Sequence, residues 1–131
     1  MKKYLSSKTA YLIFIATSAI GLLYNLAVLL RFVDYHYAWG GRLTTIESMY
    51  SFVTFSIISN LAFLTIVTVA KKQIDRNNLN SKLRILILLM AILFLVNTLG
   101  NIFAITLFEK IVFTPMTLLA SLSLFRLSSK N

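Results

Sequence analysis

The chain has 131 residues, 58% of them hydrophobic, and 13 Lys or Arg residues against 4 Asp or Glu give it a formal net charge of +9. The absence of Cys excludes disulfides and thiolate metal sites, and the length allows one small domain, residues 1–131. Nearly continuous apolar segments of this kind are typical of an integral membrane protein. The basic residues lie at the ends of the apolar runs, so we expect anionic lipid headgroups, and not nucleic acid, as their partners.

The first apolar segment predicts a membrane span over residues 10–32. Its apolar stretch is longer than the core of a signal peptide, so we expect it to remain uncleaved. Thr17, Gly21 and Asn25 recur every fourth residue and give this helix a narrow face that another helix can approach. We expect Asn25 to hydrogen-bond across that contact.

A polar and aromatic link, residues 32–43, follows the first span. Its Tyr and Trp side chains suit the headgroup layer of a membrane, where one edge of the ring meets water. His36 is the one histidine of the chain and has neither a second His nor a Cys to share a metal. We therefore expect no metal site and no cofactor.

The second apolar segment, residues 45–70, is long enough to cross a bilayer core of about 30 Å with some tilt. Thr44 and Glu47 fit the S/T-x-x-E capping box, which predicts the start of the helix. On a helical wheel Ser51 and Thr54 fall in one arc with Glu47.

A second polar set on this helix comprises Ser56, Ser59 and Asn60, which lie on the opposite side of the wheel. The amide of Asn60 cannot satisfy itself within a helix in lipid, so we expect it to face protein. Two interpretations stay open for the polar stripes: close packing of helices by small residues, or a polar cavity that binds or transforms a ligand.

A solvated basic loop, residues 71–84, leads to a third predicted span over residues 83–107. Asn97 and Asn101 lie one turn apart on one side of this helix, with Gly100 alongside. Two amides in an apolar helix need partners, and we expect these to be Asn25 or the face that carries Ser59 and Asn60. A polar interior made of Asn25, Ser51, Ser59, Asn60, Asn97 and Asn101 is predicted.

The fourth span is predicted over residues 115–128, because Thr114 and Pro115 read as an N-cap followed by a proline in the first helical position. Fourteen residues rise about 21 Å, which is short for a full crossing. The sequence therefore predicts either a local thinning of the bilayer or a chain cut from a longer one.

Charge sets the predicted orientation. On a path of four spans, ten basic residues fall on one side and three on the other, a strong bias toward a cytoplasmic placement of both termini and of the 71–84 loop. We therefore expect an all-α bundle of four antiparallel helices in the cell membrane. The ten are Lys2, Lys3, Lys8, Lys71, Lys72, Arg76, Lys82, Arg84, Arg126 and Lys130, and the three are Arg31, Arg42 and Lys110.

Two motifs carry a family resemblance: WGGRL at residues 39–43 and FVTFSIISNL at residues 52–61. They resemble the FAR-17a/androgen-induced integral membrane protein family and its bacterial Pr6Pr relatives, which have about six spans. Animal members are membrane hydrolases of fatty-acid esters of hydroxy fatty acids, with a threonine nucleophile and a histidine on a later helix. The resemblance implies Thr54 as the nucleophile, but His36 precedes this helix instead of following it.

Because a threonine hydroxyl needs a base and no histidine follows, we favour a protein without enzymatic activity: an accessory, immunity-type or lipid-binding bundle. A lipid-ester hydrolase that uses Thr54 is the alternative. A small transporter or channel that works as an oligomer is the second alternative. Expected partners are membrane lipids, and either a second copy of the chain or another membrane protein.

Overall fold

The structure is a computed structural model that describes residues 3–129, and within this range all regular secondary structure is helical. The four long helices are α1 (Ser7–Leu29), α2 (Ile46–Asp75), α3 (Ser81–Ile102) and α4 (Leu107–Ser128), and two short 3-10 turns, η1 (Tyr35–Tyr37) and η2 (Trp39–Gly41), follow α1. All four long helices have the length and apolar composition to cross a membrane. The predicted membrane bundle is confirmed in this respect. Lys2 and Lys130, which we assigned to the basic side, lie outside the described residues.

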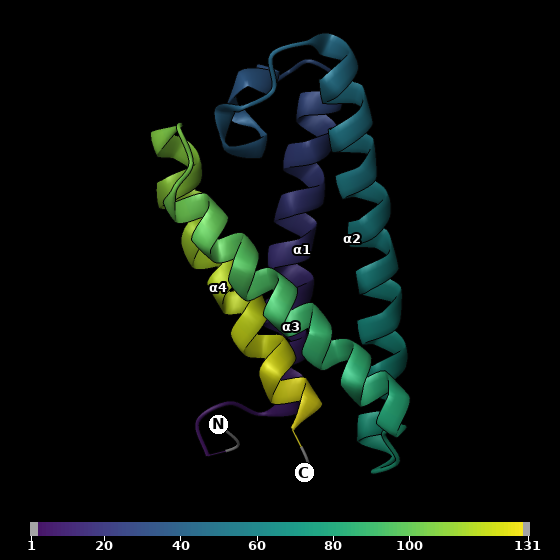
Figure 1. Ribbon diagram of the computed structural model, residues 1–131. Helices are drawn as coiled ribbons and strands as arrows, with labels where there is room; N and C mark the ends of the chain where they lie inside the picture. Colours follow the sequence, from purple (N-terminus) through teal and green to yellow (C-terminus); the bar gives the residue numbers. More distant parts are fainter. Residues whose placement is uncertain (1–2, 130–131) are drawn as a thin grey trace.

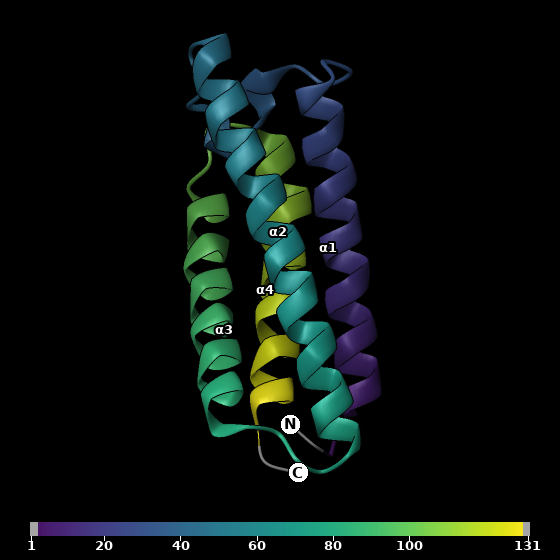
Figure 2. The ribbon, with the colours of Figure 1, turned by 90° about the vertical axis from the view of Figure 1, so that its right-hand side faces the viewer.

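The ends of the bundle differ in what they carry (Figures 1 and 2). Both ends of the chain and the α2–α3 connection lie at one end, which we call the terminal end. The segment 30–45 and the α3–α4 connection lie at the other, which we call the loop end.

The four helices do not pack evenly around a central axis. α1 packs against α2 and α4, and α3 packs along α4, whereas α2 and α3 have little contact with each other. Figure 1 shows α3 diverging from α2 toward the loop end. The bundle is therefore closed on three sides and parted on the fourth.

The terminal end holds the larger apolar core. Phe14 of α1 is fully buried there, and its ring meets that of Phe94 of α3 edge-on at 5.8 Å between centroids. Arg126 ties this end to the start of the chain, since its Nε donates a hydrogen bond of 2.6 Å to the carbonyl of Leu5. A second core, at the loop end, surrounds Met49 and Val53 of α2.

Local caps explain where three of the helices begin. The side chains of Ser6, Thr45 and Asn80 each accept a hydrogen bond from a backbone amide in the first turn of α1, α2 and α3. The predicted cap at Thr44 is therefore wrong by one residue. Glu47 lies at the second helical position of α2 and not at the third, where a capping box would require it.

The predicted bounds of the last two helices are also corrected. α3 ends at Ile102 instead of residue 107, and α4 begins at Leu107, so that Pro115 lies inside it. The apolar residues before Pro115 extend the helix by two turns in the N-terminal direction. α4 has 22 residues, as many as α3, and the expectation of a short fourth span is wrong.

Candidate functional site: a pocket between the helices

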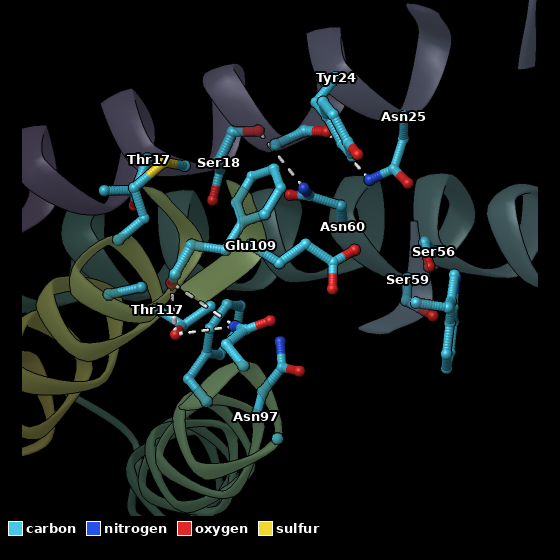
Figure 3. Close-up of a pocket in the computed structure, with 18 of the residues that line it drawn as sticks. Thr17, Ser18, Tyr24, Asn25, Ser56, Ser59, Asn60, Asn97, Glu109 and Thr117 are labelled. Carbon is cyan, nitrogen blue, oxygen red and sulfur yellow. Dashed lines mark hydrogen bonds between the residues drawn. The ribbon is translucent and has the colours of Figure 1, made fainter. Parts of the chain in front are cut away.

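A pocket of about 630 Å³ lies between the four helices, toward the loop end of the bundle (Figure 3). Each helix contributes to its wall, and Trp39 and Arg42 of the segment 30–45 line it as well. The wall mixes apolar rings with amides, hydroxyls and one carboxylate. Volume and composition are those of a small-molecule site, for which pockets of about 300–1,000 Å³ are usual.

The pocket is open on the side where α2 and α3 part. On these helices the lining residues Phe55 and Val96 are 62% and 58% exposed. On α1 and α4, by contrast, Ser18 and Glu109 are only 5% and 3% exposed. The pocket therefore has a closed back with polar groups, formed by α1 and α4, and an opening between α2 and α3 at which the apolar side chains of Phe55 and Val96 are exposed.

The loop end is closed by tight contact between two connections. Gly41 has a φ of +75°, and a Cβ there would come within 3.2 Å of both Ile105 and Thr106 in the α3–α4 connection. Only glycine combines this backbone conformation with so close an approach. Arg42 adds a hydrogen bond of 3.4 Å from its Nη2 to the carbonyl of Phe103.

Asn60 and Asn25 lie on the wall formed by α2 and α1. The Nδ2 of Asn60 donates across the helix contact to the carbonyl of Ser18 at 3.3 Å, so Asn60 faces protein, as predicted. Gly21 makes room for it, because a Cβ there would stand 3.5 Å from this nitrogen. Asn25 instead donates to the carbonyl of Gly21 in its own helix, at 2.9 Å, and the predicted bond across the contact is wrong.

Asn101 belongs to a polar contact between α3 and α4. Its Nδ2 donates to Thr117 Oγ1 at 3.3 Å, and the hydroxyl of Thr98 donates to the same oxygen at 2.9 Å. Asn101 therefore pairs with α4 and not with Asn25 or Asn60, because α3 packs on α4. Asn97, one turn away, lines the pocket and is exposed beside the opening.

Glu109 is the site residue that the sequence reasoning did not single out. It lies in the first turn of α4, is almost fully buried and lines the pocket. The tyrosine ring of Tyr24 covers this turn, with centroid distances of 5.7 Å to Phe108 and 4.7 Å to Phe113. An acidic residue between apolar segments was the available signal, but the expected helix start at Pro115 placed Glu109 in a connecting loop.

The polar arc that carries Ser51 and Thr54 does not reach the pocket. Both residues are exposed on the outer face of α2, and neither is among the described residues that line the cavity. Ser59, from the other arc, lines it.

His36 lies in η1 and pairs with Asp34, whose Oδ1 is 2.6 Å from the ring Nδ1. The backbone amide of His36 donates to the same carboxylate, and these contacts hold the pKa of Asp34 below its ordinary value. The pair is solvent-exposed at the loop end. Among residues 3–129 no three His, Cys, Asp or Glu side chains cluster as metal ligands would.

Comparison with known proteins yields no relative: no family model matches the chain, and no curated protein or solved structure is significantly similar to it. The resemblance of residues 39–43 and 52–61 to the FAR-17a family therefore stays a prediction.

Proposed function

We propose that this protein is a small membrane protein without enzymatic activity that binds a lipid or another amphiphile in the pocket between its helices. The observation that carries the proposal is the pocket's asymmetry: a buried polar back on α1 and α4, and an exposed apolar opening between α2 and α3.

This asymmetry fits an amphiphile lying in the plane of the bilayer. In a membrane the parted side of the bundle faces acyl chains, so a ligand can enter laterally without crossing water. Its polar head would reach the amides and the carboxylate at the back, while its chain remains between Phe55 and Val96. Such a head could also supply the hydrogen bond that the buried Oδ1 of Asn60 receives from no described residue.

The location of Thr54 favours binding over hydrolysis. A nucleophilic threonine must lie next to its substrate and to a base. Thr54 is exposed outside the pocket, and no described residue hydrogen-bonds to its hydroxyl. A hydrolase would therefore need a different nucleophile or a second substrate site.

The proposal includes an antiparallel bundle in the cell membrane with the terminal end in the cytoplasm. The basic residues in and beside the α2–α3 connection support this orientation, since the cytoplasmic ends of membrane spans are enriched in Lys and Arg; they are Lys71, Lys72, Arg76, Lys82 and Arg84. An Asn78→Cys substitution tests it. A membrane-impermeant thiol reagent added outside intact cells should leave this cysteine unmodified and should label it after lysis; labelling in intact cells would contradict the orientation.

Lipid binding can be followed through Trp39, the one tryptophan of the chain, which lines the pocket. In detergent micelles, brominated phospholipid should quench its fluorescence saturably, and unlabelled lipid should reverse the quenching. Gly100→Phe is the informative variant, because Gly100 lines the pocket with open space beside it.

The matched control is Leu99→Phe, which places the same ring one residue away, on an exposed position outside the pocket lining. We expect Gly100→Phe to remove the saturable quenching and Leu99→Phe to keep it. Equal quenching in both variants, or only unsaturable quenching in the parent protein, would contradict the proposal.

A further inference from the structure

The amide groups of the pocket are oriented by the backbone. A carbonyl oxygen can only accept a hydrogen bond, so an asparagine that contacts one must present its Nδ2. Asn25 and Asn60 both do so, toward the carbonyls of Gly21 and Ser18. Asn101 likewise presents its Nδ2, to the carbonyl of Phe113 and to Thr117.

The amide oxygens take no part in these bonds and remain acceptors. Asn60 Oδ1 is buried and receives no hydrogen bond from any described residue. A buried acceptor without a donor is unfavourable by about 1–3 kcal/mol, which is a reason to expect a donor from a ligand. Asn60 lies on the pocket wall, where a ligand can supply one.

Glu109 adds a carboxylate to this set of acceptors. Its side chain is 97% buried, as its exposed fraction of 3% implies, and it reaches the pocket from α4. In the view of Figure 3 its carboxylate lies between Asn60 and Asn97. An ionised carboxylate accepts hydrogen bonds and donates none.

Three hydroxyl groups of the pocket lining, those of Tyr24, Thr17 and Thr117, are committed to the backbone. The hydroxyl of Tyr24 donates to the carbonyl of Tyr37 at 3.0 Å, and that of Thr17 lies within reach of the carbonyls of Ile13 and Phe14 in its own helix. The hydroxyl of Thr117 lies 2.8 Å from the carbonyl of Phe113. Asn60 Oδ1 and the Glu109 carboxylate are therefore acceptors on the pocket wall, and the carboxylate is negatively charged when it is ionised.

We propose that the pocket selects an amphiphile whose head is a primary ammonium group, held by Glu109 and the amide oxygens of Asn60 and Asn25. A primary ammonium group has three N–H donors, no acceptor and a positive charge, and so matches this wall in both respects. A quaternary ammonium group carries the charge without the donors. A purely anionic head brings acceptors only and would be repelled by an ionised Glu109. This assignment rests on the proposed function.

Two sources share this chemistry: a phospholipid with an ethanolamine head, and a single-chain amine. Arg42 distinguishes them, because its guanidinium lines the loop end of the pocket and can pair with a phosphate. Arg42→Gln should weaken the binding of phosphatidylethanolamine and leave that of dodecylamine unchanged. If both are unaffected, the amine alone is recognised; if both weaken equally, Arg42 acts on the fold, and only the phospholipid assignment falls.

The test of the ammonium site needs no variant. Phosphatidylethanolamine, its N-methyl and N,N-dimethyl forms and phosphatidylcholine compete with brominated lipid for quenching of Trp39, all with identical chains. Each methyl group removes one donor, so affinity should fall step by step, by about tenfold or more across the series. Phosphatidylglycerol should bind no better than phosphatidylcholine.

The outcomes separate the two proposals. Equal affinity along the methylation series, or a preference for phosphatidylglycerol, would overturn the ammonium site and leave lipid binding intact. Saturable binding of none of these lipids would overturn the proposed function itself. Stepwise loss of affinity supports both.

A pair of variants tests whether the carboxylate of Glu109 determines the preference for a primary ammonium head. Glu109→Gln should remove most of the preference for phosphatidylethanolamine over phosphatidylcholine, because the amide keeps one acceptor and loses the charge. Glu47→Gln is the control, since Glu47 is an exposed carboxylate in the first turn of α2 and does not line the pocket. An unchanged preference in a folded Glu109→Gln protein would overturn the role of Glu109.

Discussion

Thr117→Val tests whether the polar contact between α3 and α4 stabilises the bundle. Valine has nearly the shape of threonine but removes the oxygen that accepts hydrogen bonds from Asn101, at 3.3 Å, and Thr98, at 2.9 Å. Hydrogen bonds between membrane helices contribute on average about 0.6 kcal/mol each, and at most about 1.7. Two such bonds give about 1.2 kcal/mol.

The loss of stability is smaller than this sum, because Thr98 and Asn101 can keep or find other acceptors. The hydroxyl of Thr98 can return to the carbonyl of Phe94 at 2.8 Å, and Asn101 keeps the carbonyl of Phe113, at the longer distance of 3.5 Å. We therefore expect a loss of about 1 kcal/mol in the free energy of unfolding.

Reversible unfolding in mixed micelles of dodecyl maltoside and SDS measures the change. Thr65→Val is the matched control, because Thr65 is exposed on α2 and its hydroxyl bonds only to the carbonyl of Leu61 in its own helix. The difference between the two variants isolates the bonds between helices. Equal losses in both would refute the reasoning, since the interhelical bonds would then contribute nothing.

Three further predictions concern the opening, the loop end and the terminal end. Gly100→Ala should raise the free energy of unfolding by about 0.8–1 kcal/mol, because alanine favours a helix and a Cβ there meets nothing within 4 Å; a lower stability in the same micelle titration would contradict this. The carboxylate of Asp34 should titrate, by NMR, below its ordinary pKa of 3.8, so its contact with His36 contributes stability above that value and loses it as the pH falls through the lowered pKa; a midpoint at or above 3.8 would show that the contact is absent. Arg126→Gln should lower stability by about 1.5–3 kcal/mol and speed amide exchange near Leu5, whose carbonyl it would no longer bind; unchanged exchange there would show that this tie does not hold the start of the chain.

The four spans could be predicted because hydropathy depends on composition alone. The start of α4 could not be predicted, since the sequence around Pro115 does not show whether the proline is at the first helical position or inside a helix. What decides is whether the preceding residues are packed as helix, and that depends on α3, which lies beside them. The predicted N-cap of α2 was wrong by one residue for a related reason. Thr44 and Thr45 are both suitable N-caps, and only the backbone conformation selects one of them.

The pocket was accessible to sequence reasoning in part. Asn25, Ser59, Asn60, Asn97 and Asn101 all line it, because a polar side chain in an apolar helix turns toward protein. Their partners were not predictable, since periodicity gives the face of each helix and not the neighbour that it meets. Ser51 illustrates the limit: a hydroxyl near the end of a span can remain exposed, and its place on a helical wheel does not show this.

The tie between Leu5 and Arg126 has a consequence for how the chain is assembled. The two residues are 121 positions apart, and α1 packs along the last helix as well as along α2. During synthesis α1 is made before α2, α3 and α4, yet one of its sides is covered only after α4 has been made. Until then Phe14, at the centre of the larger core, lacks neighbours such as Ala120 and Leu124 from α4. Closure of such a distant contact is a late step, so the α1–α2 hairpin must persist in the membrane as a partly assembled intermediate.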